Sequence, residues 1–493
     1  MNIYDTLSDS VKLFSHKTAV TGPDGSYTYS ELFNYSKKIA SHLSRLKTVS
    51  GKKAVIYIQS SADFVASLYG ANMAGMVFMP VSPEAKDLKI QEILQHSEAG
   101  ILITTGSLME VINSMDISRI PSLKNIVLLE DSFDETRAQI KCNITRISRD
   151  SSKADDFILH NWEENQPAAI FYLANTHGKP KGIMLSSKNI LSNVEAIVEY
   201  LKMSNRDNIL IVKSMSLVGT VTGEIIASVA VGAAMVVIGG IIHAGVILKV
   251  IEDFKVTGFF AVPVMLHQII EYKRKDKYSI ESLRYIQTGA ARLSMKDVEQ
   301  LMDMYKGVEL YYIYGISEAS PRVLHLRPEE MLLKAGSVGK PVKFVSVSLL
   351  DANGNIPGIS EVGELYVKGP NVMLGYYKDP ELNNKVLTPY GLKTGDLAYM
   401  DDEGYVYLVG RADNMINQGG FHVYPAEIEK VISKLEKVKE VKVEGVPDDV
   451  LGQRIKAKVT PHENADLSAD EIYSFCYEHM ENSKIPKIIE ILN

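Results

Sequence analysis

The chain has 493 residues, which is too long for one ordinary compact core and predicts two or more domains or subdomains. Hydrophobic residues make up 46% and charged residues 23%, as is usual for a globular protein. The 53 basic and 60 acidic side chains give a net charge of −7, which excludes a general electrostatic attraction to nucleic acid or anionic lipid. Cys142 and Cys476 lie far apart in no metal-like spacing, and residues 1–20 show no secretory signal, so we expect a cytoplasmic protein.

Apolar runs rich in β-forming residues alternate with helical patterns through most of the chain. Strands are predicted at Ala54–Ile58, Ile101–Thr104, Ile126–Leu129, Ala168–Leu173, Ile209–Val212, Ala234–Ile238, Gly258–Val262, Tyr285–Thr288 and Leu310–Tyr314. Helices are predicted between them, at Ser61–Ala74, Asp87–His96, Lys188–Leu201 and Lys296–Tyr305. This alternation predicts an α/β fold in which helices cover stacked parallel sheets, and ligands bind at the carboxyl ends of the strands.

One apolar run is long enough to cross a bilayer. No residue from Ile225 to Leu248 is formally charged. Glycines interrupt the run, however, and Ala234 to Ile238 has the pattern of a buried strand between two helices. We therefore predict the interior of an α/β sheet at this place, and no membrane span.

The pattern changes after about Gly336. Short strands separated by turn signals follow, at Val342–Leu350, Gly363–Val367 and Tyr405–Val409, and they predict a small antiparallel barrel or sheet over about residues 336–410. Mixed elements return beyond Gly410, with helices at Pro425–Leu435 and Ser468–Met480 and strands at Val441–Val446 and Ile455–Val459. We predict an N-terminal domain of residues 1–410 and a small, mobile α/β domain of residues 411–493.

Two polar segments at predicted strand ends have the chemistry of a nucleotide site. The loop from Phe171 to Gly182 offers backbone N–H groups and lysine ammonium groups to a phosphate, with a solvated basic turn as the alternative. In Tyr314-Gly315-Ile316-Ser317-Glu318, the ring can stack on a purine and the glycine permits close approach of a ligand. Ser317 can donate to phosphate, and Glu318 can hold Mg²⁺, although a single glutamate is more often a surface carboxylate.

A third segment runs from Lys393-Thr394-Gly395-Asp396-Leu397 to Gly410-Arg411-Ala412-Asp413. A carboxylate at a turn can accept both hydroxyls of a ribose, and a guanidinium can reach ribose or phosphate. A hairpin with a surface ion pair is the simpler explanation of this segment when it is taken alone.

Taken together, these segments resemble the AMP-forming adenylating enzymes, which comprise acyl- and aryl-CoA ligases, adenylation domains of peptide synthetases, and luciferases. The resemblance extends from Tyr27–Leu32 almost to the end of the chain. It includes Ala74-Gly75, Met79–Pro83, Thr288–Ala291, Gly336–Pro341, Gly363–Pro370, Gly375–Tyr377 and Gly419–Glu429, the last being similar to the CoA-ligase branch.

The resemblance implies an enzyme that uses ATP and Mg²⁺ to activate a small carboxylic acid as an acyl-adenylate. The acyl group would then pass to the thiol of CoA or of phosphopantetheine on an acyl carrier protein. The residues implied are Thr176, Lys181 and Glu318 for catalysis, with Glu318 and Thr176 on the metal, and Tyr314, Gly315, Ser317, Asp396, Arg411, Gly289 and Ala290 on the nucleotide. The remaining positions are a hinge at Asp413, a thiol tunnel at Gly419, Gly420 and Phe421, and an acyl pocket at Ser216 and Gly219.

The chain departs from the family pattern at three places. Leu173, Ala174, Asn175 and His177 replace small or hydroxyl residues of the phosphate loop, and Met215-Ser216 replaces an aromatic–His pair of the acyl pocket. The final Gly-Lys motif, whose lysine serves adenylation, does not follow Lys484–Lys487. Truncation of an ordinary ligase is one explanation. The others are a homologue impaired in adenylation that uses a preformed activated acyl group, and a non-catalytic sensor of nucleotide or acyl-adenylate.

Overall fold

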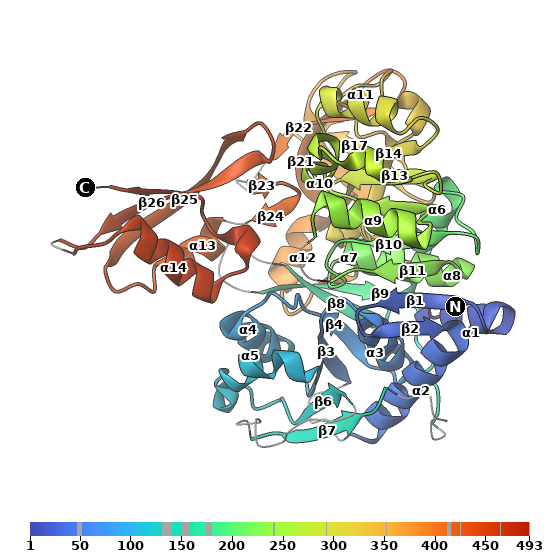
Figure 1. The fold of residues 1–493 in the computed structure, drawn as a ribbon. Coiled ribbons are helices and arrows are strands. Elements are labelled where there is room, and N and C mark those ends of the chain that lie inside the picture. The colour runs from blue at the N-terminus through green and yellow to red at the C-terminus, as the bar shows by residue number, and fades with distance from the viewer. Residues whose placement is uncertain are drawn as a thin grey trace.

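The structure is a computed structural model of the chain. It describes residues 1–46, 52–130, 141–149, 157–173, 180–239, 242–291, 293–351, 353–411, 416–423, 425–463 and 465–492. Two large sheets, a smaller antiparallel sheet and a C-terminal α/β unit make up the fold (Figure 1). The predicted mixed α/β class, with a large N-terminal part and a small C-terminal part, is confirmed.

The first large sheet has eight strands in the order β19-β9-β8-β4-β3-β5-β6-β7. Its strands from β4 to β7 run parallel, and β8 pairs antiparallel with β9. The strands are β3 (Lys53–Tyr57), β4 (Val77–Pro80), β5 (Ile101–Thr104), β6 (Asn125–Leu129), β7 (Asn143–Ile147), β8 (Pro167–Leu173), β9 (Lys181–Ser186) and β19 (Gly375–Tyr376).

The second large sheet has nine strands in the order β16-β15-β14-β13-β12-β10-β11-β1-β2. The strands from β14 to β1 are parallel, and those at both edges are antiparallel. They are β1 (Thr18–Gly22), β2 (Gly25–Thr28), β10 (Asn208–Ile211), β11 (Ala234–Val237), β12 (Gly258–Phe260), β13 (Tyr285–Gly289), β14 (Glu309–Gly315), β15 (Arg322–Leu326) and β16 (Lys340–Pro341).

Helices cover the two large sheets and lie between them. They are α1 (Ile3–Phe14), α2 (Tyr29–Arg45), α3 (Ala62–Met73), α4 (Asp87–Ser97), α5 (Met109–Asn113), α6 (Ser187–Tyr200), α7 (Val218–Thr220), α8 (Ala227–Val231), α9 (Ala244–Phe254), α10 (Pro263–Glu271) and α11 (Met295–Met304). A π-helical segment, η4 (Val221–Ile226), joins α7 to α8. Every residue of α3 is buried, including the polar Asp63, Ser67 and Asn72, which explains why the helix has no polar face of its own.

Local sequence signals account for the start of individual helices. Thr28 caps α2: its hydroxyl accepts from the Glu31 backbone N–H at 3.2 Å, and the Glu31 carboxylate accepts from the Thr28 N–H at 2.8 Å. This reciprocal pair satisfies two N–H groups that the helix cannot satisfy itself. Ser186 caps α6 in the same way, and the Asn189 side-chain amide then donates to the carbonyls of Pro370 and Val372.

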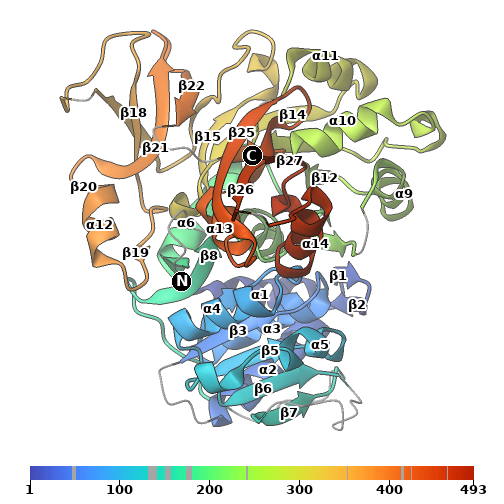
Figure 2. The same cartoon turned by 90° about the vertical axis from the view of Figure 1, so that its left-hand side faces the viewer.

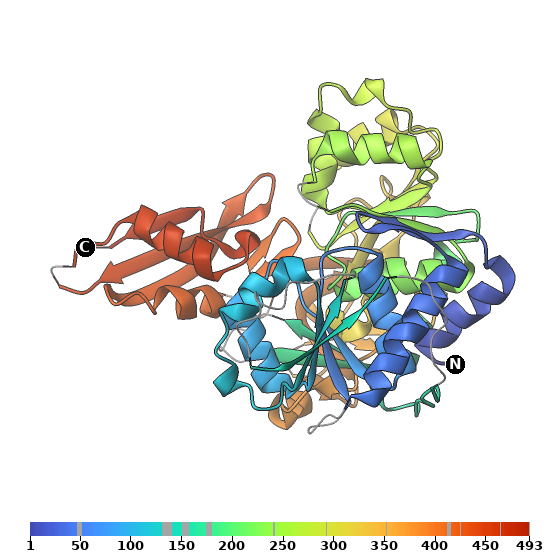
Figure 3. The same cartoon turned by 60° about the horizontal axis from the view of Figure 1, so that its bottom comes forward.

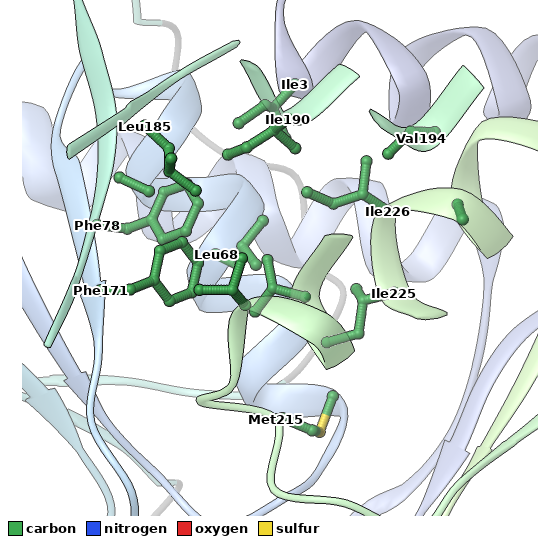
Figure 4. Packing of buried hydrophobic residues seen from close by; sticks show 14 of the residues in the cluster. Ile3, Leu68, Phe78, Phe171, Leu185, Ile190, Val194, Met215, Ile225 and Ile226 are labelled. Carbon is green, nitrogen blue, oxygen red and sulfur yellow. The ribbon is translucent and has the colours of Figure 1, made fainter. Parts of the chain in front are cut away.

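The apolar run at 225–248 belongs to the interior of the second large sheet. It comprises the end of η4, α8, β11 and the first part of α9, as predicted. Ile225 and Ile226 pack in one core cluster with Phe78 and Phe171 of the other large sheet (Figure 4). Within the described ranges, no helix combines the length and apolarity needed to cross a membrane.

The predicted small antiparallel unit after Gly336 is a five-stranded sheet in the order β17-β18-β21-β20, with β22 paired to β21. Its strands are β17 (Ser346–Leu350), β18 (Gly363–Lys368), β20 (Leu387–Thr388), β21 (Gly391–Met400) and β22 (Val406–Arg411), and α12 (Pro380–Val386) precedes β20. The sheet lies beside the second large sheet, and β18, β20, β21 and β22 are labelled in Figure 2. A backbone bridge between Gly339 and Val406 links it to the segment that leads into β16 of that sheet.

The C-terminal unit has a hydrophobic core of its own, drawn from residues between Ile416 and Ile485. It contains β23 (Ile416–Gln418), β24 (Phe421–Val423), α13 (Pro425–Ile432), β25 (Val438–Asp448), β26 (Gly452–Pro461), α14 (Ala469–His479) and β27 (Ile488–Ile491). It extends away from the rest of the molecule, and its β23–β24 hairpin is turned towards the larger part (Figures 1 and 3).

Candidate active site

Strands β13 and β14 place Gly289 and Gly315 at the carboxyl end of the second large sheet. Gly289 is the register partner of Ile313, so the two strands end side by side. A Cβ atom on Gly289 would lie 2.1 Å from the Ile313 carbonyl oxygen, and one on Gly315 would lie 2.0 Å from the Pro321 carbonyl oxygen. Both distances are shorter than any van der Waals contact. Only glycine therefore allows the backbone segments to approach this closely at the strand ends.

This close approach predicts a large loss of stability when Gly289 is replaced. The Gly289→Ala variant should lower the free energy of unfolding by about 3 kcal/mol or more, because a methyl group must displace backbone. Gly358→Ala is the matched control, since the atoms nearest a Cβ there belong to the flexible end of Glu361. Urea unfolding measures both variants. Equal midpoints for the two would contradict the prediction.

Tyr314, at the end of β14, is joined to Asp396 on β21. The Tyr314 hydroxyl donates to Asp396 Oδ2 at 2.5 Å, and the two residues are only 8% and 7% exposed. The Asp396 backbone N–H donates to the Thr394 hydroxyl at 3.0 Å, which fixes the turn that carries the carboxylate. Asp396 is the register partner of Arg411 on β22. The structure thus brings together the sequence-predicted tyrosine and aspartate. The Arg411 side chain and the whole of Asp413 lie outside its described part.

Glu318 lies three residues beyond the end of β14, in the single turn η6 (Ser317–Ala319) that Ser317 begins. The Tyr376 hydroxyl donates to Glu318 Oε1 at 2.7 Å. Tyr376 belongs to β19, which pairs with β9, and the Lys181 ammonium at the start of β9 lies 5.9 Å from the Tyr376 ring centroid. Tyr376 therefore links Glu318 to Lys181. Thr176, the other predicted catalytic residue, falls outside the described residues.

Tyr376 was not among the site residues predicted from the sequence. Its neighbourhood could have indicated it, because Gly375-Tyr376-Tyr377 is one of the family-like segments. The contact itself joins residues 58 positions apart and depends on the pairing of β19 with β9.

The predicted acyl-pocket residues follow β10. Ser216 exchanges a hydrogen bond of 2.8 Å with Ser214, and both side chains are half-buried. A Cβ atom on Gly219 would lie 3.5 Å from Nη1 of Arg322 and 3.9 Å from Nζ of Lys213. Neither cation was predicted from the sequence as a site residue. The one sequence signal that could have indicated them is that each is a charged residue next to an apolar run.

Of the predicted thiol-tunnel residues, Gly419 and Gly420 form the turn between β23 and β24, and Phe421 begins β24. A Cβ atom on Gly420 would lie 3.1 Å from Val262 Cγ1 and 3.3 Å from the Ala290 Cβ, so this turn lies against the ends of β12 and β13. The Asn417 side-chain amide donates to the Ala290 carbonyl oxygen at 2.7 Å. Phe421 is exposed. Gly420 therefore lies close to Ala290, which follows β13. Tyr314 lies at the end of β14, the strand next to β13.

A second contact holds the C-terminal unit against α4. The Glu427 carboxylate on α13 pairs with Lys484 at 3.1 Å and with Lys89 of α4 at 3.7 Å. Glu481 lies 3.5 Å from the Lys484 ammonium, and these charges raise the pKa of Lys484 against the lowering effect of burial. Lys484 is therefore held as a cation between two glutamates in a half-buried network.

Comparison with known proteins identifies the chain. The family model for the AMP-binding enzyme matches residues 7–377, and the model for the AMP-binding enzyme C-terminal domain matches residues 427–493. The chain belongs to the AMP-binding enzyme family. It is an enzyme of the AMP-forming acyl- and aryl-CoA ligase type, as predicted.

Relatives in this family act on different acids. A long-chain-fatty-acid–CoA ligase from Bacillus subtilis is 27% identical, over 98% of this chain and 90% of its own. A feruloyl-CoA synthase from an Amycolatopsis species is 26% identical, over 97% of this chain and 92% of its own. Because one name specifies a fatty acid and the other an aromatic acid, family membership leaves the substrate open.

Solved structures of the o-succinylbenzoate CoA synthetase from Bacillus subtilis, 26% identical to this chain, share its fold. A double mutant of that enzyme bound with its product analogue gives a TM-score of 0.84 over 100% of this chain and 94% of the other. The complex of that enzyme with ATP and magnesium ion gives 0.70 over 99% and 95%. The two comparisons cover nearly the same residues, so this chain is more similar in its overall arrangement to the product-analogue complex.

Proposed function

We propose that the enzyme activates a carboxylic acid with ATP and transfers the acyl group to the thiol of CoA, with a carrier-protein phosphopantetheine as the second candidate acceptor. The observation that carries the proposal is the buried Tyr314–Asp396 pair at the end of β14, with Glu318 beside it on the same segment. A purine face, a ribose acceptor and a metal-binding carboxylate are the three groups that ATP requires. The two free cysteines suit the reducing cytoplasm as its compartment.

In the first step, an oxygen of the substrate carboxylate attacks the α-phosphorus of ATP. A new P–O bond forms as the bond to the leaving pyrophosphate breaks. We assign purine contact to Tyr314 beside Gly289, Ala290 and Gly315, and ribose contact to Asp396 and Arg411. Ser317, Thr176 and Lys181 would contact phosphate, and their donors would stabilise the charge that develops there.

The site contains a carboxylate suited to Mg²⁺. Glu318 is half-buried, and Tyr376 orients one of its oxygens through the 2.7 Å hydrogen bond. Hard divalent cations prefer such oxygen ligands, so Glu318 and Thr176 would hold the ion, which neutralises phosphate charge when bound. Lys181 lies near enough to Tyr376 to add positive charge to the same region.

In the second step, the thiol sulfur attacks the acyl carbon, the C–S bond forms, and the bond to AMP breaks. The thiol proton passes to solvent. The Gly419–Gly420 turn, with Phe421 after it, lies against Val262 and Ala290 and would border the path of the thiol arm. The greater similarity to the product-analogue complex supports this pose of the C-terminal unit for the transfer step.

One incubation tests the proposal directly. The purified chain, ATP, Mg²⁺ and pooled aliphatic and aromatic carboxylates are combined with and without CoA, and AMP and acyl products are measured by mass spectrometry. Carboxylate-dependent AMP with acyl-CoA is the expected result. Absence of AMP from folded protein would contradict it.

The position of Gly420 allows the two steps to be separated. A Gly420→Ala change should slow thioester formation from a preformed acyl-adenylate by roughly 10- to 100-fold, because small displacements of the hairpin misplace the thiol. Carboxylate-dependent exchange of pyrophosphate into ATP should change much less. The control is Gly404→Ala: φ is +83° at Gly404 and +88° at Gly420, but a Cβ on Gly404 meets no atom within 4 Å. Equal effects of both variants on transfer would contradict the assignment.

A further inference from the structure

A buried cluster of charge adjoins the predicted acyl pocket. Lys213 Nζ pairs with Glu224 Oε1 at 2.7 Å, and these side chains are only 9% and 1% exposed. The Lys213 ammonium lies 3.6 Å from the centroid of the Phe260 ring, and the Arg322 guanidinium carbon lies 4.9 Å from the same centroid. Two cations therefore meet at one aromatic ring, and one carboxylate pairs with the first of them.

Arg322 is the one cation of this cluster that forms no ion pair among the described residues. The residue is 3% exposed, and its Nε and Nη2 atoms have no hydrogen-bond partner among the described residues. Its charge, together with burial, opposes protonation of Lys213 and helps to lower the pKa of that lysine to about 8, while Glu224 acts in the opposite sense. A guanidinium held away from water without an acceptor is costly. The arrangement therefore lacks one anion.

The cluster lies one strand away from the proposed nucleotide site. Arg322 begins β15 and is the register partner of Gly315 at the end of β14. Glu224 belongs to the π-helical segment η4, a rare conformation that often marks functional sites. Gly219 faces Nη1 of Arg322 and Nζ of Lys213, whereas Nη2 of Arg322 lies on the side of Gly223. The segment from Ser214 to Gly219 is partly exposed, so this cluster lies just below the surface. Ser317 lies two residues beyond Gly315, so the proposed reaction site and Arg322 are on neighbouring segments.

We propose that the acid activated by this enzyme carries a second, distal carboxylate, which binds Arg322 beside the Lys213–Glu224 pair. The substrate class is therefore the dicarboxylic acids, an inference that rests on the ligase activity proposed above. A guanidinium can bind a carboxylate through two parallel hydrogen bonds, and Nε and Nη2 of Arg322 have no hydrogen-bond partner in the described structure. Glu224 already neutralises Lys213, so the charge of Arg322 remains for the ligand. A neutral acyl chain would leave the buried guanidinium without an anionic partner.

Matched acids test the inference on the unmodified chain. Linear dicarboxylic acids of about four to ten carbons and the phthalic acids serve as probes, each beside its monocarboxylic analogue and its mono-amide. With ATP, Mg²⁺ and CoA, AMP release gives kcat/KM for each acid. We expect at least one dicarboxylic acid to exceed both of its analogues by roughly 100-fold. Monocarboxylic acids that react as well or better would overturn the inference and leave the ligase activity standing. AMP release with none of the acids would instead contradict the proposed function itself.

Replacement of Arg322 shows whether this residue sets the preference. The Arg322→Leu variant should reduce the dicarboxylate-to-monocarboxylate ratio of kcat/KM by roughly 100-fold, and Arg322→Lys should give an intermediate ratio. The lysine variant retains a buried cation and provides the test if the leucine variant does not fold. Arg327→Leu, at an exposed position just beyond β15, is the matched control and should keep the wild-type ratio. An unchanged ratio in the Arg322 variants would overturn the assignment, because a purely structural residue would affect both acids equally.

Discussion

Replacing Asp396 with alanine should lower kcat/KM for ATP by roughly 10²- to 10⁴-fold. The carboxylate is placed to accept both hydroxyls of a ribose, and each hydrogen bond to a charged group contributes about 1.5–3 kcal/mol. The structure fixes this carboxylate from two directions, through the Tyr314 hydroxyl and through the turn that Thr394 closes. The effect should appear mainly as a higher KM for ATP, measured by AMP release at saturating acid.

Two further variants separate ribose binding from other effects of a lost charge. Asp402→Ala removes an exposed carboxylate six residues further along the chain and should leave kcat/KM for ATP unchanged. Tyr314→Phe removes only the 2.5 Å hydrogen bond and should cost roughly 10-fold, since the ring remains. A wild-type KM for ATP in folded Asp396→Ala would remove Asp396 from the proposed ribose site.

The strand and helix pattern was predictable because periodic burial is a local property. Predicted Leu310–Tyr314 became β14 (Glu309–Gly315), and predicted Lys188–Leu201 became α6 (Ser187–Tyr200). The placement of Tyr314 at a strand end also followed from the sequence, since polar segments after buried strands meet at one edge of a parallel sheet. The observed ends of these elements differ from the predicted ends by a residue or two, because the terminal residues of helices and strands are the least regular.

The contacts that complete the site were not predictable in the same way. Tyr376 reaches Glu318 only because β19 joins the edge of the first large sheet beside β9. Arg322 and Lys213 are 109 positions apart, and no local pattern brings them to the Phe260 ring. A buried charge is visible in a sequence only as an ionisable residue next to an apolar run. Its partner, or its lack of one, is a property of the tertiary structure.

Replacing Glu318 with glutamine should reduce carboxylate-dependent adenylation by roughly 10²- to 10³-fold. Glutamine keeps the size of the side chain and an acceptor for the Tyr376 hydroxyl, so the local hydrogen bond can survive. It removes the negative charge that the proposed Mg²⁺ site requires. The loss should therefore be partly recovered at high Mg²⁺, which distinguishes weaker metal binding from a general disturbance of the fold.

Measuring adenylation and acyl transfer separately gives the most specific test of this prediction. Pyrophosphate leaves only in the first step, so Glu318→Gln should spare the transfer of a preformed acyl-adenylate to CoA, measured as acyl-CoA formed. Gly420→Ala should show the opposite pattern. Glu309→Gln, at the other end of β14, is the control for loss of a carboxylate from the same strand. Wild-type adenylation by Glu318→Gln, with unchanged dependence on Mg²⁺, would assign Glu318 a structural role through Tyr376 and place the metal elsewhere.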